Sequence, residues 1–370
     1  MQALLARIFS RLMKSWSWLL LILLTIAIKW ISLYPDFVEK NYSLAAYPLI
    51  SRVQRLLFGW IPFSLGDVVY GFLWLVVFYK TWILIRDLFR KKVNRAYLLS
   101  GMQQIFFFIL FVYVFFNLLW GLNYNRTGIA GQLGLEVKKY AVADLDTLTG
   151  AIENKLNYYA QFVTKEQRDS FNKKSRLFYT AGLAYQDAAK KYPFLSFKGN
   201  STKPSLYSYL GNYLGFQGYY NPFSGEAQVN TTVPRFIEPF VTSHEIAHQL
   251  GYARENEANF VGFLATHRFP NNAFLYSVYY DMYNYCIIEL GSYDTTLAHA
   301  SVERLHPQVK KDIKTYRDFY KRYRNPVEPI VMWGYGQFLK ANNQPEGKRS
   351  YNEVVLWLVA YYKKYGVSQL

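Results

Sequence analysis

The first third of the chain contains three long runs of apolar side chains, at residues 16–34, 68–85 and 105–120. A helix needs about 20 apolar residues to cross the hydrocarbon layer of a bilayer, and each run is close to that length. The first run carries one charged residue, Lys29, near its end, where a long side chain can reach the headgroups. We predict three transmembrane helices, with buried core helices as the alternative for the second and third runs.

A different pattern separates the first two runs. The stretch YPLISRVQRLLFGWIPFSLGD has apolar residues at helical spacing, with Arg52 and Arg55 between them. This pattern is typical of a helix that lies on a membrane surface, and equally of a helix that packs onto a core. We expect this interfacial segment either to cover the domain that follows or to dock it on the membrane.

Beyond about residue 123 the apolar positions recur in shorter helical stretches, which predicts a mostly helical domain. The expected helices cover residues 143–163, 167–191, 236–249, 254–267, 273–289, 307–323, 331–340 and 352–362. A strand is expected at residues 227–233, after the turn-forming sequence YNPFSGE. The predicted fold class is mainly α, with a membrane anchor at residues 1–122 and an α+β domain with a small sheet at residues 123–370.

Basic residues flank the apolar runs and predict the orientation of the chain in a membrane. The 370 residues carry a net charge of +17, and cationic side chains gather before the first run and between the second and third: Arg7, Arg11, Lys14, Arg86, Arg90, Lys91, Lys92 and Arg95. Short basic flanks stay in the cytoplasm, so the domain from about residue 123 is expected outside it. The basic surface suits lipid headgroups or envelope polymers, and no nucleic-acid partner is expected. The one cysteine, Cys286, excludes an intrachain disulfide and is expected to be buried.

The sequence HEIAH places His244 and His248 one helical turn apart on the same face, where both can bind one metal ion. Neutral imidazole groups suit Zn²⁺. Glu245 lies beside them and is expected to act as the general base that takes a proton from the water activated by zinc. Gly251 then stands where a residue in the left-handed conformation often ends a helix. An amphipathic helix whose histidines fall one turn apart by chance is the alternative.

A catalytic zinc usually has three protein ligands, so a third is expected nearby. Some zinc proteases with this spacing place a third histidine six residues after the second, but Arg254 occupies that position. Glu255 is the preferred third ligand, with Asn259 one turn later as its hydrogen-bonding partner, and Glu257 is the alternative. The other three histidines are expected at the surface or at helix caps: His267, His299 and His306.

The sequence GFQGYYNPFSGEAQVN precedes the metal motif and contains the expected strand. A strand beside the metal helix can pair with an extended peptide substrate, and an ordinary hairpin that supports the core is the alternative. Glu226, in this stretch, is expected either to bind a substrate amine or to be exposed.

Four stretches together resemble one protein family: LFGWIPFSLGD, GLNYNR, YYNPFSGEAQVN and HEIAHQLGYARENEANF, following three apolar runs. They are similar to the bacterial membrane family called domain of unknown function 3810, over nearly the whole chain. The resemblance implies a location in the bacterial cytoplasmic membrane and no established substrate. Locally, Glu255 followed by Ala258 and Asn259 is similar to the signature of Glu-zincin peptidases. That likeness implies a zincin-like domain in which Glu255 binds zinc, although the separation from His248 is shorter than is usual there.

The expected function is that of a membrane-anchored zinc metallopeptidase with its catalytic domain outside the cytoplasm. His244, His248 and Glu255 are expected to bind zinc, Glu245 to act as the base, and an envelope protein or peptide to be the substrate. Two alternatives remain, a zinc amidase that acts on cell-wall peptide and an envelope scaffold without catalysis. The sequence predicts neither the substrate nor the oligomeric state.

Overall fold

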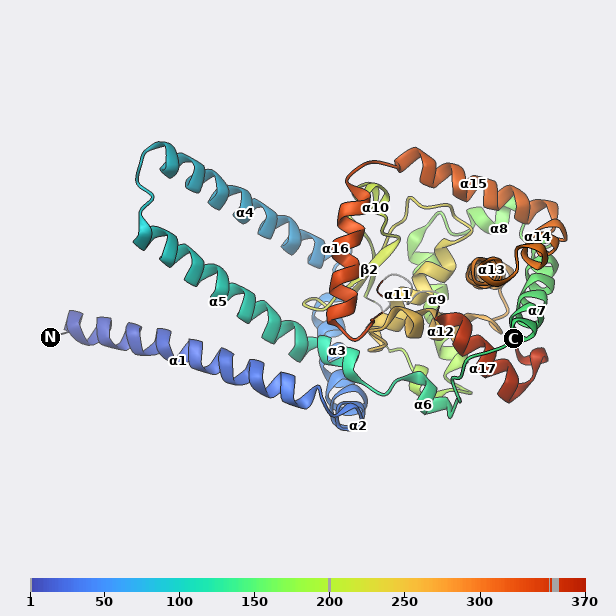
Figure 1. Ribbon diagram of the computed structural model, residues 1–370, viewed down its shortest axis with the longest axis horizontal. Coiled ribbons are helices and arrows are strands. Elements are labelled where there is room, and N and C mark those ends of the chain that lie inside the picture. The colour runs from blue at the N-terminus through green and yellow to red at the C-terminus, as the bar shows by residue number, and fades with distance from the viewer. Residues whose placement is uncertain (1, 199–200, 346, 348–352) are drawn as a thin grey trace.

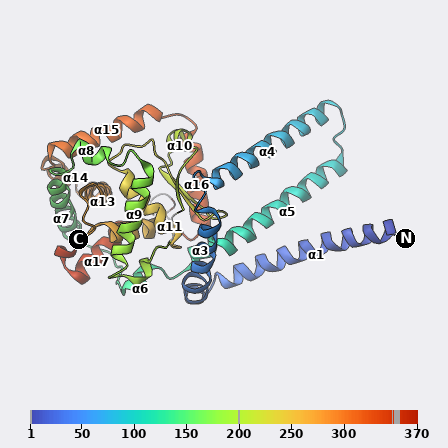
Figure 2. The same cartoon turned by 180° about the vertical axis from the view of Figure 1, so that it is seen from behind.

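The computed structural model of the protein describes residues 2–198, 201–345, 347 and 353–370, with side chains from residue 15 onward. Three long helices extend from one side of a globular helical body, and the N-terminus lies at their far end (Figure 1). They are α1 (Gln2–Ile31), α4 (Leu65–Phe89) and α5 (Arg95–Leu119). Seen from behind, the same helices still project on one side, with α3 (Tyr47–Phe58) across their base (Figure 2). One face of the body is therefore turned towards the long helices.

Helices α4 and α5 are long and apolar enough to cross a membrane, as predicted for the second and third runs. In α4 no residue of the most apolar window is buried, and in α5 only 11% of that window is, so these are not core helices. Both extend beyond the predicted bounds because polar residues complete their first turns. The side chains of Ser64 and Asn94 accept hydrogen bonds from backbone N–H groups there, as helix N-caps do.

The first apolar run ends as a helix at Ile31 rather than at residue 34. After a turn the chain leaves at an angle of 104° and continues to the end of α3. This second arm consists of α2 (Pro35–Phe37), the π-helix η1 (Val38–Ala46) and α3. Among the described residues, two helices can therefore cross a membrane, and three if this bent pair forms one span.

The interfacial segment forms the predicted helix, and one face of α3 packs onto the body. The Tyr47 hydroxyl and Ser51 Oγ donate hydrogen bonds to the carbonyl oxygen of Gln249, at 2.9 and 3.0 Å. Gln249 ends helix α11 (Glu238–Gln249), whose last carbonyl groups lack partners within the helix itself. On the other face, Leu49 and Leu56 are 65% and 76% exposed. The segment thus covers the body with one side and leaves an apolar side open.

The body has one large apolar core, which runs between α7, α9, α11, α12, α13 and α17. The bounds of the core helices not yet given are α7 (Val142–Ala160), α9 (Lys174–Ala188), α12 (Glu255–Thr266), α13 (Asn272–Tyr293) and α17 (Val354–Tyr365). Around them lie η2 (Gly121–Asn125), α6 (Ile129–Leu133), α8 (Lys165–Asp169), η3 (Pro193–Leu195), α10 (Ser208–Leu214), α14 (Thr295–Glu303), α15 (Pro307–Tyr323), α16 (Glu328–Ala341) and η5 (Val367–Gln369). Cys286 is buried in α13, as predicted.

The predicted helix at residues 167–191 is wrong as a single element, because α8 and α9 are separate. Tertiary contacts fix the chain between α8 and α9. Arg168 makes two hydrogen bonds to Asp312, and the ring of Phe171 packs edge-on against Phe274 with the ring centroids 5.6 Å apart. Helices α10 and α14 were not predicted. The expected start of the last helix, Asn352, lies outside the described residues.

The sheet has three short strands, β1 (Thr202–Pro204), β2 (Gly218–Asn221) and β3 (Glu226–Val229), in the order β1-β3-β2. β3 is parallel to β1 and antiparallel to β2, with Gly218 opposite Val229. The predicted strand ends at Val229 rather than at residue 233, because the chain then turns towards α11. β2 is an edge strand, and it lies close to α11. The fold is mainly helical with a small sheet, as expected.

Candidate metal centre

Helix α11 brings His244 and His248 together, and their Nε2 atoms lie 3.1 Å apart. Each ring is held by a contact at its other nitrogen. His248 Nδ1 lies 2.7 Å from the carbonyl oxygen of Tyr252, and His244 Nδ1 lies 2.8 Å from Asn259 Oδ1. A carbonyl oxygen can only accept a hydrogen bond, so in each neutral imidazole ring the proton is on Nδ1. Both Nε2 atoms then present lone pairs to the same point.

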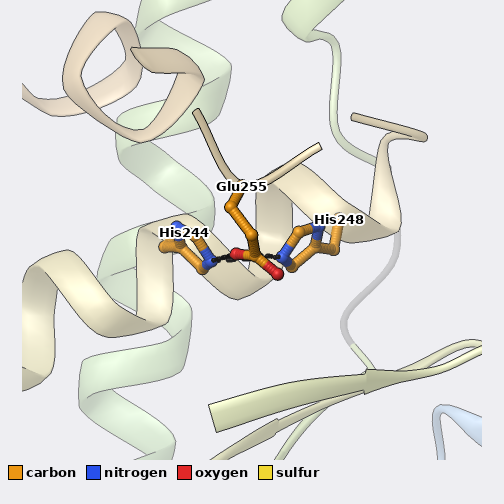
Figure 3. Close-up of side chains that lie close together, drawn as sticks. All are labelled: His244, His248 and Glu255. Atoms are coloured by element: carbon orange, nitrogen blue, oxygen red, sulfur yellow. Dashed lines mark hydrogen bonds and ion pairs between the residues drawn. The ribbon is translucent and has the colours of Figure 1, made fainter. Parts of the chain in front are cut away.

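Glu255 completes the group from the first turn of α12 (Figure 3). Between the two helices Gly251 adopts φ = +86°, the left-handed conformation predicted for it, and this reversal brings α12 back against α11. Glu255 Oε2 lies 3.2 Å from His244 Nε2 and 3.6 Å from His248 Nε2. With zinc–ligand bonds of about 2.0–2.1 Å in a tetrahedral site, neighbouring ligand atoms are about 3.3 Å apart, so this triangle has the size of a zinc site.

The electrostatics of the group favour a positive charge at its centre. Burial disfavours the ionised form of Glu255, but the two imidazoles outweigh it and hold the pKa of its carboxyl well below the usual range. Burial also lowers the pKa of His248, yet its contact with Glu255 raises it to about 9. Two imidazole lone pairs and a carboxylate oxygen this close require a cation or a proton between them. The donor set therefore fits a metal ion such as Zn²⁺.

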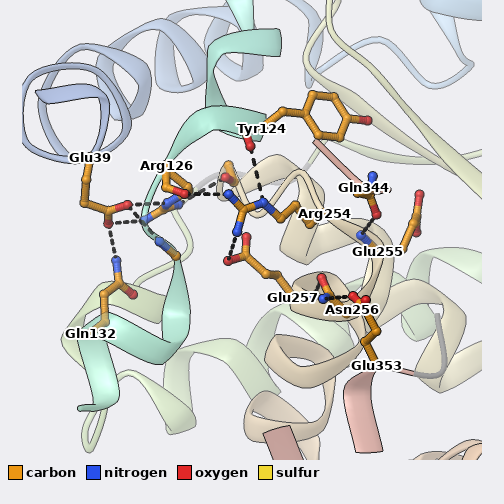
Figure 4. A network of polar contacts seen from close by, with 12 residues as sticks. Glu39, Tyr124, Arg126, Gln132, Arg254, Glu255, Asn256, Glu257, Gln344 and Glu353 are labelled. Atoms are coloured by element: carbon orange, nitrogen blue, oxygen red, sulfur yellow. Dashed lines mark hydrogen bonds and ion pairs between the residues drawn. The ribbon is translucent and has the colours of Figure 1, made fainter. Parts of the chain in front are cut away.

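Glu257, the alternative third ligand, points towards Arg254 and away from Glu255 (Figure 4). Its Oε1 atom lies 3.9 Å from Arg254 Nη1, and the whole side chain is buried. Arg254 in turn donates to the carbonyl oxygen of Arg126, whose guanidinium makes two hydrogen bonds to Glu39. This network joins α12 to η1, at the base of the long helices. Of the two carboxylates, the fold brings Glu255 to the histidines.

Asn259 has a different partner from the one expected, because its side chain holds His244 and not Glu255. The partner of Glu255 is Tyr335 in α16, whose hydroxyl donates to Glu255 Oε1 at 2.5 Å. Trp120, at the end of α5, donates from its indole nitrogen to the carbonyl oxygen of His248 at 3.0 Å. Neither aromatic residue was predicted from the sequence. With 34 tyrosines and nine tryptophans in the chain, no local signal singles them out.

Glu245 lies on α11 beside the candidate ligands and faces the edge strand β2. Its Oε2 atom is buried and has no hydrogen-bonding partner among the described residues. A Cβ atom on Gly218 would lie only 2.4 Å from Glu245 Oε1, so a residue without a side chain leaves room for the carboxylate. Burial raises the pKa of Glu245 to about 7, a value that suits proton transfer near neutral pH.

A cavity of about 470 Å³ opens over these groups. His244, Glu245, His248 and Glu255 line it, and Gly218 of β2 lies beside Glu245. Its other walls come from α4, α5, α13 and α16. The site thus combines a candidate metal centre, a buried carboxylate and an edge strand in one space.

The remaining predicted side chains have structural surroundings. His306 is the N-cap of α15 and His299 is exposed, as expected. His267 ends α12 as its C-cap residue, one of the two positions expected for it, but its ring is buried against Phe263, and this burial lowers its pKa to about 3. Glu226 is buried rather than exposed, and it is not among the residues that line the cavity. Its carboxylate accepts hydrogen bonds from the backbone N–H groups that begin α4, the nearest at 2.7 Å from Gly66.

The sequence model of the family described as a protein of unknown function (DUF3810) matches residues 42–359. The match covers most of the chain, so the chain belongs to this family, as its motifs indicated. No curated protein and no solved structure matches the chain. Family membership assigns no chemistry, and the function must be inferred from the site itself.

Proposed function

We propose that this DUF3810 family member is a membrane-anchored zinc metallopeptidase with a zincin-like catalytic domain outside the cytoplasm. One observation carries the proposal: His244 Nε2, His248 Nε2 and Glu255 Oε2 converge at 3.1–3.6 Å, while both Nδ1 atoms are occupied by other partners. Three buried acceptors aimed at one point, with an open cavity beside them, are the ligand set of a catalytic zinc site.

Each side chain then has a role in peptide hydrolysis. Bound Zn²⁺ supplies Lewis acidity, which polarises a carbonyl group and makes water reactive near neutral pH. Glu245 accepts the proton from the attacking water and passes it to the leaving amine. The free edge of β2 binds the substrate main chain in an extended conformation, and Gly218 lets that strand lie close to Glu245.

The location of the site supports an envelope protein or peptide as the substrate. Basic residues in the N-terminal half of α1 and around the connection of α4 to α5 favour the cytoplasm for those segments, which puts the body on the opposite side of a bacterial cytoplasmic membrane. The metal helix itself is buried in protein rather than exposed to lipid. A water-filled site near the membrane surface suits hydrolysis of exported polypeptides.

The first test is the metal content of the purified full-length protein in detergent, measured by elemental analysis. The full chain is needed because Tyr47, Ser51 and Trp120 bind the last carbonyl groups of α11. We expect about one zinc per chain, lost in His248→Ala and retained in the control His299→Ala, which changes an exposed histidine. Well-folded native protein without zinc would contradict the proposal.

The second test separates an enzyme from a scaffold. Glu245→Gln should keep the zinc and abolish hydrolysis of a quenched fluorescent peptide library, because the amide cannot accept the proton. Equal hydrolysis by Glu245→Gln and the native protein would contradict the role of this residue as base. Zinc without any hydrolysis of peptides or of cell-wall peptide would indicate a structural metal site.

A further inference from the structure

We propose that the cavity opens sideways towards the membrane between α4 and α5, and that its substrate is a polypeptide anchored in the same bilayer. The inference rests on the proposed peptidase function and specifies its substrate class. The scissile segment is the stretch of the substrate that emerges at the outer membrane surface. Four features of the described residues lead to this proposal.

The first feature is that the membrane helices themselves form walls of the cavity. Tyr70 of α4, and Val112 and Phe116 of α5, line the same space as Glu245. Val112 lies about two helical turns before the end of α5 at Leu119. A spanning segment of about 20 residues that begins just after Arg95 reaches to about Phe116, so Val112 lies within the hydrocarbon layer. The cavity therefore extends from the metal centre to the outer part of the hydrocarbon layer.

The second feature is that its lining combines two kinds of surface. The residues that α5 and α16 contribute include the apolar side chains Val112, Phe116 and Phe338. The candidate metal ligands, Glu245 and the edge strand β2 line the same cavity. A ligand that matches both surfaces has an apolar portion beside the long helices and a peptide main chain at the metal group. A membrane-anchored polypeptide has this composition.

The third feature concerns charge. Among the described residues that line the cavity there is no lysine or arginine. Anionic lipid headgroups and anionic wall polymers usually bind where cationic side chains are present. The lining favours an uncharged main chain over these ligands, although the protein as a whole is strongly basic.

The fourth feature is the apolar flank of the opening. Helix α16 contributes Met332, Tyr335 and Phe338 to the cavity, and the Phe338 ring contacts Phe116 of α5 edge-on at 6.1 Å. On its outer side α16 exposes Ile330 and Trp333, at 68% and 67%. In Figure 1 α16 stands on the face of the body that is turned towards the long helices. Lipid at this face covers those side chains and is continuous with the lipid around α4 and α5.

The test compares one degenerate, quenched peptide in two forms. In one form the peptide is free, and in the other it is joined by a short linker to an apolar helix of about 20 residues inserted in the same vesicles. The enzyme is the full-length protein, reconstituted in phosphatidylethanolamine and phosphatidylglycerol vesicles. Val112→Trp fills the membrane end of the cavity. The matched control is Ile109→Trp, at a lipid-exposed position of α5 outside the cavity lining.

We expect the anchored peptide to be cleaved at least about tenfold faster than the free one at equal bulk concentration. Val112→Trp should remove most of this difference, Ile109→Trp should preserve it, and Glu245→Gln should cleave neither form. Zinc content equal to that of the native protein shows that Val112→Trp is folded.

Four results would overturn the inference. Equal cleavage of both forms, or an unaffected Val112→Trp, would leave the peptidase in place and remove the membrane entrance. Faster cleavage of the free peptide by Val112→Trp would show that a lipid molecule occupies this end of the cavity. If neither the free nor the anchored peptide is cleaved in a way that Glu245→Gln abolishes, the peptidase proposal is overturned as well.

Discussion

The hydroxyl group of Tyr335 lies 2.5 Å from Glu255 Oε1, so a side chain 80 residues away orients the candidate third ligand. The other carboxylate oxygen, Oε2, is left to face the two histidines. Tyr335 belongs to α16, the helix that also lines the cavity. The ligand is thus oriented by an element that joins the candidate metal centre to the side of the body facing the long helices.

Replacing Tyr335 by Phe removes this hydrogen bond and leaves the ring in place. Partners of metal ligands usually contribute about 10- to 100-fold to metal affinity, and we expect a loss of that size for zinc. Competition with a chromophoric chelator measures it. Trp333→Phe is the control, because Trp333 lies on the same helix and is 67% exposed. An unchanged affinity in Tyr335→Phe would show that Glu255 is oriented by other contacts.

The two acidic residues of α12 should differ in metal binding. Glu255→Gln removes the negative charge of the candidate ligand beside both histidines, and this protein is expected to lose zinc. Glu257→Gln is expected to keep about one zinc per chain. Glu257 lies by Arg254 instead, so its substitution acts on packing and not on the metal. Elemental analysis of the two proteins side by side decides the matter. Loss of zinc from Glu257→Gln alone would assign the third ligand to Glu257.

A methyl group at position 218 should disturb catalysis without removing the metal. In Gly218→Ala the new Cβ would lie 2.4 Å from Glu245 Oε1, and the carboxylate has to move. A displacement of about 1 Å at a reacting group commonly costs about 100-fold in rate, so we expect a fall of that order in kcat with zinc retained. Gly150→Ala is the control, since its Cβ would meet nothing within 4 Å. Native rates in Gly218→Ala would mean that Glu245 works from another position.

The buried His267 should make the folded protein sensitive to acid. Its folded-state pKa of about 3 lies below the unfolded value of about 6.5, so the unfolded chain binds the extra proton between these values. This contribution to the free energy of unfolding is complete above pH 6.5 and falls by about 1.4 kcal/mol per pH unit below it. Unfolding in denaturant at several pH values, in detergent, measures the slope. His267→Phe should reduce the slope of the free energy of unfolding against pH, and the exposed-site control His299→Gln should leave it unchanged. Equal slopes in the native protein and both variants would contradict the role of His267.

Local periodicity predicted much of this protein. The 3.6-residue period predicted the long apolar helices and the helix with His244 and His248 on one face. The conformational freedom of glycine predicted the turn at Gly251. The predictions failed where contacts between residues far apart in the sequence determine the local structure. Arg168 and Phe171 break a continuous helical pattern through contacts to α15 and α13, and the buried position of His267 carries no mark in its own neighbourhood.

The sequence by itself determined the family, the mainly helical class, the helices long and apolar enough to cross a membrane, and the positions of two histidines relative to each other, because each depends on residues within a few turns. The tertiary structure decided which of Glu255 and Glu257 reaches the histidines, since that depends on how α12 folds back on α11. It also decided that Tyr335, Gly218 and the membrane helices surround the same cavity. Such long-range contacts depend on side-chain shape and burial over the whole body, and no short stretch of the chain encodes them.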